Sequence, residues 1–151
     1  MKIIAHRANL TGKGSSENEP AGIIKAIDAG FDVEIDVRIY ENKLWLGHSG
    51  PEYELSFEFL KEIIPYAWIH CKDLDALDFF ASRPDLRAQY FWHQTDDYTV
   101  TSHGIIWAFP GKPVTPNSVI LLPEYNDYII DKSAYGICTD VPYEMVGLLN
   151  A

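Results

Sequence analysis

Strand-like and helix-like segments alternate through the first half of the chain. Residues 2–5 form a short apolar run, and residues 31–40 alternate strictly between apolar and polar side chains, as expected for strands. Between them, residues 19–30 are predicted to form a helix, with Pro20 in its first turn and Gly30 at its end. A helix that joins two strands in this way is typical of βαβ units, whose strands are parallel. The order therefore predicts a parallel sheet covered by helices.

The remaining segments extend this pattern and then change it. Further strands are predicted at residues 43–48, 67–72, 88–94, 98–109, 118–124 and 135–140, and further helices at residues 56–66, 73–86 and 141–149. Ser56 and either Asp73 or Asp75 are the expected helix caps. After residue 94 the connections are too short for full helices, and prolines punctuate them.

Seven or eight strands fit either a (β/α) barrel or an open α/β sheet. The chain has 151 residues, far fewer than the roughly 250 of a typical barrel. We therefore expect residues 1–151 to form a single α/β domain. The expected fold is a compact TIM-type (β/α) barrel with seven or eight strands, in which several helices are shortened or replaced by loops.

The overall charge excludes some partners. A formal net charge of −10 disfavours a nucleic-acid or anionic-membrane surface, whereas a small anionic substrate stays compatible with local cations or a metal. No segment reaches the roughly 18 apolar residues of a membrane span, and the chain turns polar after its first five residues. We therefore expect a cytoplasmic protein. Cys71 and Cys138 lie in apolar runs and are expected to be reduced core residues.

Ionisable side chains gather at the carboxyl ends of the predicted strands. They are His6, Arg7, Glu34, Asp36, His48, His70, Lys72, His93, Glu124 and Asp140. In parallel α/β folds this edge of the sheet carries the ligand site. The sequence therefore predicts a site at this edge.

Glu34 and Asp36 lie two residues apart on one face of their strand, together with Arg38. Such a face is often solvated, and an ion pair with the carboxylates is the simplest role for Arg38. A central strand of a parallel sheet is covered on both faces, however, and buried carboxylates must be paired or bind a metal. Two carboxylates at this spacing can reach one hard cation. Alone, His70 fits a rim or core histidine and Lys72 a surface lysine.

Taken in order, six segments resemble the glycerophosphodiester phosphodiesterase family. This family belongs to a superfamily with phosphatidylinositol-specific phospholipase C and the spider-venom phospholipase D enzymes. The matching segments are "AHRAN", "SSENEPAG", "AGFDVEIDV", "LWLGHS", "IHCK" and "YGICTDVP". Together they span nearly the whole chain.

The resemblance implies a TIM-type barrel with one divalent metal ion, Mg²⁺, Mn²⁺ or Ca²⁺. Glu34 and Asp36 would hold the metal, and His6 and His48 would be the general acid/base pair. Lys72, helped by Arg7, would contact the phosphate. Supporting positions are Glu17, Asn18, Glu124 and Asp140.

Three positions depart from the family pattern. His70 stands where the family has a third metal-ligand glutamate, which moves the expected preference toward Mn²⁺ or Zn²⁺. Ala8 replaces a glycine, which restricts the backbone, and Ser49 replaces an aspartate. The family has an inserted subdomain that binds the substrate, and residues 48–55 are the only candidate segment for its place in this chain.

We therefore expect a metal-dependent phosphodiesterase that hydrolyses a glycerophosphodiester or a similar small phosphodiester. One alternative is a catalytically weak or inactive barrel that binds a phosphorylated small molecule. Another is an unrelated α/β domain with incidental histidines. That last alternative would place His6 and His48 on opposite faces.

Overall fold

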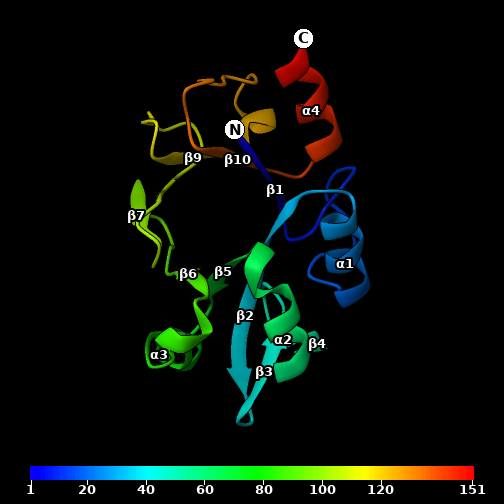
Figure 1. Cartoon of the computed structure of the whole chain (residues 1–151), viewed down its shortest axis with the longest axis vertical. Coiled ribbons are helices and arrows are strands. Elements are labelled where there is room, and N and C mark those ends of the chain that lie inside the picture. Colours follow the sequence, from blue (N-terminus) through cyan, green and yellow to red (C-terminus); the bar gives the residue numbers. More distant parts are fainter.

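The computed structural model describes residues 1–151 and has the predicted alternation of strands and helices (Figure 1). The strands are β1 (Lys2–His6), β2 (Asp32–Tyr40), β3 (Lys43–Leu46), β4 (Tyr53–Glu54), β5 (Ala67–Cys71), β6 (Gln89–Phe91), β7 (Tyr98–Val100), β8 (Ile106–Ala108), β9 (Ser118–Leu121) and β10 (Gly136–Thr139). The α-helices are α1 (Pro20–Asp28), α2 (Phe57–Ile63), α3 (Leu74–Ala81) and α4 (Pro142–Asn150). Three short 3-10 helices are η1 (Ile64–Tyr66), η2 (Pro84–Leu86) and η3 (Pro123–Tyr125).

Local signals determine where the helices begin and end. Pro20 is the first residue of α1, and Gly30 follows its end with φ of 91°, a conformation that favours glycine. The side chain of Ser56 caps α2 by accepting the backbone N–H of Phe59. Asp73, and not Asp75, caps α3.

The parallel strands follow one another in chain order around a curled sheet. β1 pairs with β2, β2 with β5, and β5 with β6; on the other side β8 pairs with β9, β9 with β10, and β10 with β1. The last parallel strand therefore lies beside the first, as it does in a barrel (Figure 1). No ladder joins β6 to β8, so the barrel is open at this point. Ser102 bridges part of the opening, because its backbone N–H donates to the carbonyl of Tyr90 and its hydroxyl accepts the Tyr90 N–H.

The strand count differs from the seven or eight expected. The sheet has ten strands, because β3, β4 and β7 add antiparallel pairs to the parallel array. β4 has two residues and β7 has three, too few for a periodic pattern to be recognised. The mixed α/β character and the barrel-like curl are confirmed, whereas the complete barrel is not.

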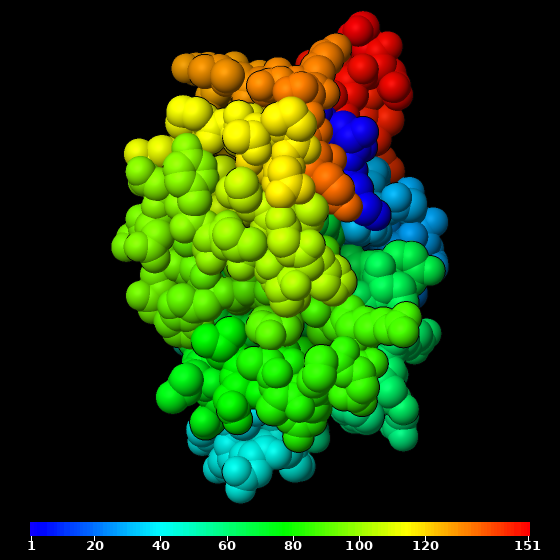
Figure 2. Space-filling model, turned by 60° about the vertical axis from the view of Figure 1, so that its left-hand side comes forward, coloured from blue at the N-terminus to red at the C-terminus, as the bar shows by residue number.

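Helices cover one side of the curl. Three helices precede β6, and the only α-helix after it is α4 (Figure 1). Loops and η3 connect the strands between β6 and β10, which confirms that helices are replaced by loops after residue 94. In the space-filling view these residues, from yellow-green to orange, form much of the visible surface (Figure 2). None of the helices has the length and apolar character that crossing a bilayer requires.

The alternation of side chains along each strand separates two layers. The largest hydrophobic cluster includes Val33, Ile35 and Ile69 and packs with helix residues such as Ile23 and Leu60. The opposite faces of the strands fill the inside of the curl with Ile4, Trp68, Phe91, Trp107, Val119 and Cys138. Further along these strands the inner face carries ionisable side chains, namely His6 on β1, Glu34 on β2 and His70 on β5. Cys71 and Cys138 are both buried and free, as expected.

Candidate active site

A cavity of about 290 Å³ opens at the carboxyl ends of the strands. Of the ten ionisable residues predicted at this edge, seven line it: His6, Arg7, Glu34, His48, His70, Lys72 and His93. His6 and His48 therefore share one cavity, which contradicts the alternative that placed them on opposite faces.

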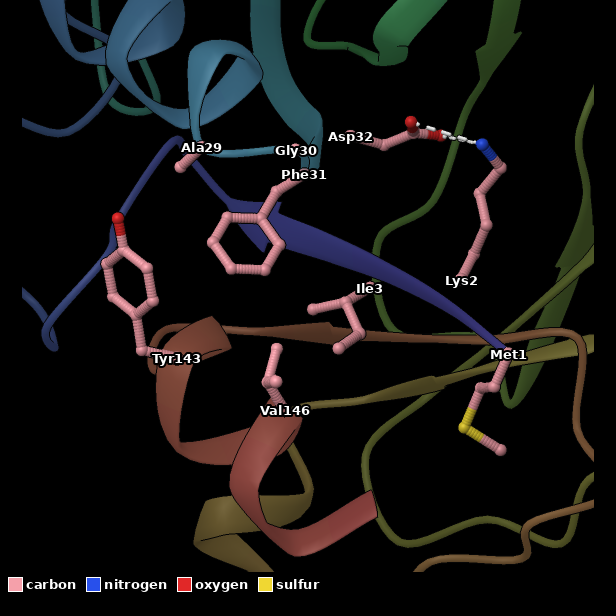
Figure 3. A pocket seen from close by; sticks show the side chains of 9 residues that line it. All are labelled: Met1, Lys2, Ile3, Ala29, Gly30, Phe31, Asp32, Tyr143 and Val146. Atoms are coloured by element: carbon pink, nitrogen blue, oxygen red, sulfur yellow. Dashed lines mark hydrogen bonds and ion pairs between the residues drawn. The ribbon is translucent and has the colours of Figure 1, made fainter. Parts of the chain in front are cut away.

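A larger hollow of about 530 Å³ lies at the amino ends of β1 and β2 (Figure 3). Its lining is mostly apolar and includes Ile3, Phe31 and Val146. Its only ion pair joins Lys2 to Asp32, at 3.0 Å. Because it holds no histidine and no group of carboxylates, the cavity at the carboxyl ends is the candidate site.

Glu34 and Asp36 face into the curl and are 2% and 1% exposed, so the solvated-face interpretation is wrong. The Asn18 side chain donates to Asp36 Oδ2 at 3.0 Å and accepts the Asp36 N–H at 2.9 Å. Burial alone would raise the pKa of Asp36, but His48, the Arg7 guanidinium and the Asn18 amide outweigh it. The pKa of Asp36 therefore lies well below its ordinary value, and the carboxylate is ionised at neutral pH.

His70 points a ring nitrogen at both carboxylates. Its Nδ1 lies 3.4 Å from Asp36 Oδ1 and 3.7 Å from Glu34 Oε1. On the other side of the ring, Nε2 is 2.8 Å from the backbone carbonyl of His93. A carbonyl only accepts, so Nε2 carries a proton and the lone pair of a neutral ring is on Nδ1.

The donor set of Glu34, Asp36 and His70 fits a divalent cation. One ligand atom from each residue lies within 4.8 Å of the other two. Asp36 Oδ1 is buried and has no hydrogen-bond donor, although the other oxygen of the same carboxylate has one. Metal-ligating histidines usually donate their second ring N–H to a carbonyl or carboxylate, as His70 does here. Two carboxylates and an imidazole suit Mn²⁺ or Zn²⁺ better than Mg²⁺ or Ca²⁺, which prefer oxygen ligands only.

His6 forms a buried dyad with Asp140. Its Nδ1 donates to Asp140 Oδ1 at 2.8 Å, and its Nε2 lies 3.8 Å from Glu34 Oε2. Burial alone would lower the pKa of His6, but the hydrogen bond to Asp140 and the charges of Glu34 and Asp140 outweigh it. The pKa of His6 is therefore raised, and its protonated form is favoured.

Asp140 is held by groups from η3 and from the loop after β1. Asn9 donates to its Oδ1 at 2.8 Å, and Tyr125 donates to its Oδ2 at 3.0 Å. Its backbone N–H donates to Glu124 Oε1 at 2.7 Å. Burial would raise the pKa of Asp140, but the hydrogen bonds from His6 and Asn9 outweigh it, so this pKa is lowered.

Glu17 and Glu124 support the site from its edge. Glu17 accepts hydrogen bonds from Asn9 at 2.8 Å and from Arg7 at 3.4 Å. Glu124 accepts the Thr139 hydroxyl at 3.0 Å in addition to the Asp140 N–H, so it holds the end of β10. Neither residue lines the cavity.

Arg7 contacts His48 and both buried carboxylates of the site. Its Nη2 donates to His48 Nε2 at 3.3 Å, and its Nε lies 3.3 Å from Asp36 Oδ2. Its backbone N–H donates to Glu34 Oε2 at 3.1 Å, because Arg7 and Ala8 are both left-handed, with φ of 50° and 60°. At Ala8 this conformation costs about 1–2 kcal/mol, which the glycine of the family pattern avoids.

Two lysines, Lys72 and Lys13, line the cavity. Lys72 Nζ lies 3.9 Å from Asp36 Oδ1, and Lys13 contributes a cation that the sequence interpretation did not single out. With Arg7, they bring three cationic side chains to the lining of the cavity, beside one carboxylate, Glu34.

The expected ion pair of Arg38 with the carboxylates is wrong. Arg38 instead donates from Nε to the carbonyl of Gly47 at 3.1 Å and from Nη2 to the carbonyl of His48 at 2.7 Å. Its role is to hold the turn that carries His48. Gly47 has φ of 151°, and a Cβ there would lie 1.9 Å from the carbonyl oxygen of Gly50. Only glycine therefore fits directly before His48.

Comparisons with known proteins agree with the fold. No family model matches the sequence, and neither does any curated protein. The structure is similar to a glycerophosphodiester phosphodiesterase from Parabacteroides distasonis, with a TM-score of 0.53 and 14% identity over 99% of this chain and 96% of the other. It is also similar to a putative glycerophosphodiester phosphodiesterase from Galdieria sulphuraria, with a TM-score of 0.53 and 11% identity over 99% of this chain and 98% of the other. The resemblance drawn from the sequence motifs is therefore confirmed at the level of the fold.

Proposed function

We propose that residues 1–151 form one phosphodiesterase-like domain with metal-dependent phosphodiesterase activity. Its substrate is a glycerophosphodiester or a similar small phosphodiester. The observation that carries the proposal is that His6 and His48 line one cavity together with Glu34 and His70, which form a set of three metal-ligand candidates with the adjacent Asp36. The fold shared with two proteins described as glycerophosphodiester phosphodiesterases supports it.

Glu34, Asp36 and His70 would hold the ion, with Mn²⁺ or Zn²⁺ favoured and Mg²⁺ or Ca²⁺ as the family alternatives. Bound there, a divalent cation supplies positive charge to the non-bridging oxygens of the phosphodiester. Lys72 and Arg7 line the same cavity and add fixed positive charge where negative charge builds up.

The two histidines have different surroundings and take different roles. His6 is favoured in its protonated form by Asp140, so Nε2 donates a proton to the oxygen of the leaving alcohol. His48 Nε2 accepts a hydrogen bond from Arg7 and carries no proton there. An entering phosphodiester competes for Arg7, which frees this nitrogen to take a proton from the attacking oxygen.

The direct test is an assay of the purified protein with glycerophosphocholine and glycerophosphoglycerol. Release of glycerol phosphate is measured after chelation and after addition of Mn²⁺, Zn²⁺, Mg²⁺ or Ca²⁺. We expect turnover with at least one ion and none after chelation. Calorimetric binding of the diesters without turnover under any ion would instead favour the alternative of a binding module for phosphorylated small molecules.

The turn before His48 gives a prediction about positioning. Gly47→Ala forces the turn to move because its Cβ meets the Gly50 carbonyl, and His48 moves with it. We expect kcat to fall about 10–100-fold, the scale of a misplacement near 1 Å. Gly50→Ala is the matched control, since nothing lies within 4 Å of a Cβ at that glycine, and its kcat should stay within about twofold. Equal rates for both variants would contradict the assigned role of the turn.

Asp140→Asn removes the charge that favours protonated His6. We expect kcat/KM to fall about 10²–10³-fold, by analogy with aspartates that orient a catalytic histidine. Tyr125→Phe removes one hydrogen bond to the same carboxylate but keeps its charge, and should lose less than about tenfold. A loss in Tyr125→Phe as large as in Asp140→Asn would contradict this assignment.

The Asp140→Asn variant also has a signature in acid. Because the pKa of Asp140 is lowered in the folded state, its carboxylate stabilises the protein above its ordinary pKa of 3.8. This contribution is lost as the pH falls through the lower pKa of the folded protein. In urea unfolding, the difference between wild type and Asp140→Asn should be largest between about pH 5 and 6.5. It should shrink below pH 3.8, and it should also shrink as the pH rises through the raised pKa of His6, because Asp140 stabilises the protonated ring.

A further inference from the structure

The cavity has two sides of different chemistry. The ionisable residues come from β1, β2 and β5 and from the segments that follow β1, β3, β5 and β6. The opposite wall comes from β8, β9 and the residues after them. We call this second side the apolar wall; it consists of Trp107, Phe109, Pro110, Leu121 and Leu122. β9 lies across the curl from β2 (Figure 1). The metal-ligand candidates and the apolar wall therefore face a bound molecule from different sides.

Leu122 has a backbone that favours glycine. Its φ is 51° and its ψ is 54°, and it is held there by its N–H, which donates to the Cys138 carbonyl at 2.7 Å. Left-handed backbone is unfavourable for leucine, whereas glycine adopts it freely. A leucine at this position therefore lowers the stability of the fold relative to glycine, unless its side chain makes a favourable contact.

Packing of the fold does not explain Leu122. Leu121 packs against the cluster inside the curl, but Leu122 belongs to no hydrophobic cluster and packs against none of them. Its half-buried side chain lines the cavity instead. Strained backbone that presents a side chain to a cavity is typical of functional sites.

We infer that the apolar wall selects phosphodiesters in which one alcohol is uncharged and apolar, and that Leu122 is the specificity-determining residue. This inference rests on the proposed phosphodiesterase function. A cationic alcohol such as choline is disfavoured because Lys13, which has no ion-pair partner, lines the same cavity as the wall. At about 290 Å³ the cavity suits a short alkyl or single-ring group.

The test compares three glycerol 3-phosphodiesters, whose second alcohols are ethanol, hexanol and choline. Ethanol and hexanol have similar acidity, so a difference between them reports contact with the chain and not leaving-group chemistry. Each buried methylene contributes about 0.8 kcal/mol, so burying even two of the four extra methylenes gives about a tenfold preference. We expect wild type to prefer the hexyl over the ethyl diester in kcat/KM by at least about tenfold, with the choline diester poorest.

Two variants test the residue itself. Leu122→Gly and Leu122→Asn both suit the left-handed backbone and remove the apolar side chain. We expect the ratio of hexyl to ethyl kcat/KM to fall to about twofold or less, with no loss of stability. Arg87→Gly is the matched control, because Arg87 is also left-handed, with φ of 53°, and does not line this cavity. It should keep the wild-type preference.

The outcomes separate the two proposals. No turnover of any diester under any metal would overturn the proposed function and the inference with it. Turnover without a hexyl preference, or a preference unchanged in Leu122→Gly, would leave the phosphodiesterase standing and overturn the inference. A choline diester preferred over both alkyl diesters would also overturn it.

Discussion

His6→Ala and His48→Ala should each lower kcat on an alkyl glycerophosphodiester by about 10²–10⁴-fold, the range of general acid–base contributions. Both side chains line one cavity, and each donates to or accepts from a different charged partner. Because both histidines serve the same reaction, kcat of the double variant should be only a little below that of the less active single variant. His103→Ala is the control, since His103 is exposed and lies outside the cavity, and its rate should be unchanged.

The roles of the two histidines can be separated with a better leaving group. p-Nitrophenolate leaves without a proton, so His6→Ala should lose far less activity on bis(p-nitrophenyl) phosphate than on the alkyl diester. His48→Ala should lose about the same on both substrates. His6→Gln supplements His6→Ala, because alanine leaves the buried Asp140 without the His6 hydrogen bond and can destabilise the fold. Wild-type rates in both alanine variants, with circular dichroism unchanged, would refute two-histidine catalysis.

Local features made most of the fold predictable. Ser56 and Asp73 cap helices through hydrogen bonds three residues along the chain, and such contacts can be recognised in a sequence. No ladder joins β6 to β8, and the contact between Ser102 and Tyr90 that bridges part of this opening has no local signal in the sequence. Closure of the expected barrel is therefore not confirmed at this one long-range junction.

The same distinction applies to the candidate site. The proximity of His6, Glu34 and His70 could be predicted from the sequence, because parallel strands end at one edge of the sheet and alternate side chains share a face. Arg38 follows the same alternation, and the prediction for it was wrong because its long side chain turns to the carbonyls of the His48 turn.

Some contributors to the site were not predicted at all. Asn9, Tyr125 and Leu122 reach the site from loops and from η3, through turns that have no periodic pattern. Only Asn9 had a possible signal, since it follows the His-Arg pair directly.

Asp36→Asn should weaken binding of Mn²⁺ by at least about 100-fold in isothermal titration calorimetry of the folded protein. The substitution removes one of two buried carboxylates and leaves Arg7 and Lys72 without the charge they face. Asp32→Asn is the matched control. Asp32 lies on the same strand but pairs with Lys2 and accepts the Trp68 indole N–H, so Mn²⁺ affinity should stay within about twofold.

His70→Glu tests the position at which this chain departs from the family pattern. A third carboxylate should move the preference from Zn²⁺ and Mn²⁺ toward Mg²⁺ and Ca²⁺, because hard ions favour oxygen donors. The ratio of Zn²⁺ to Ca²⁺ affinity should fall at least about tenfold. This ratio depends on donor type and not on overall stability, so it separates a ligand role from the stacking of His70 on Phe91 and its bond to the His93 carbonyl. An unchanged ratio, or Mn²⁺ bound equally well by wild type and Asp36→Asn, would show that these three residues do not hold the ion.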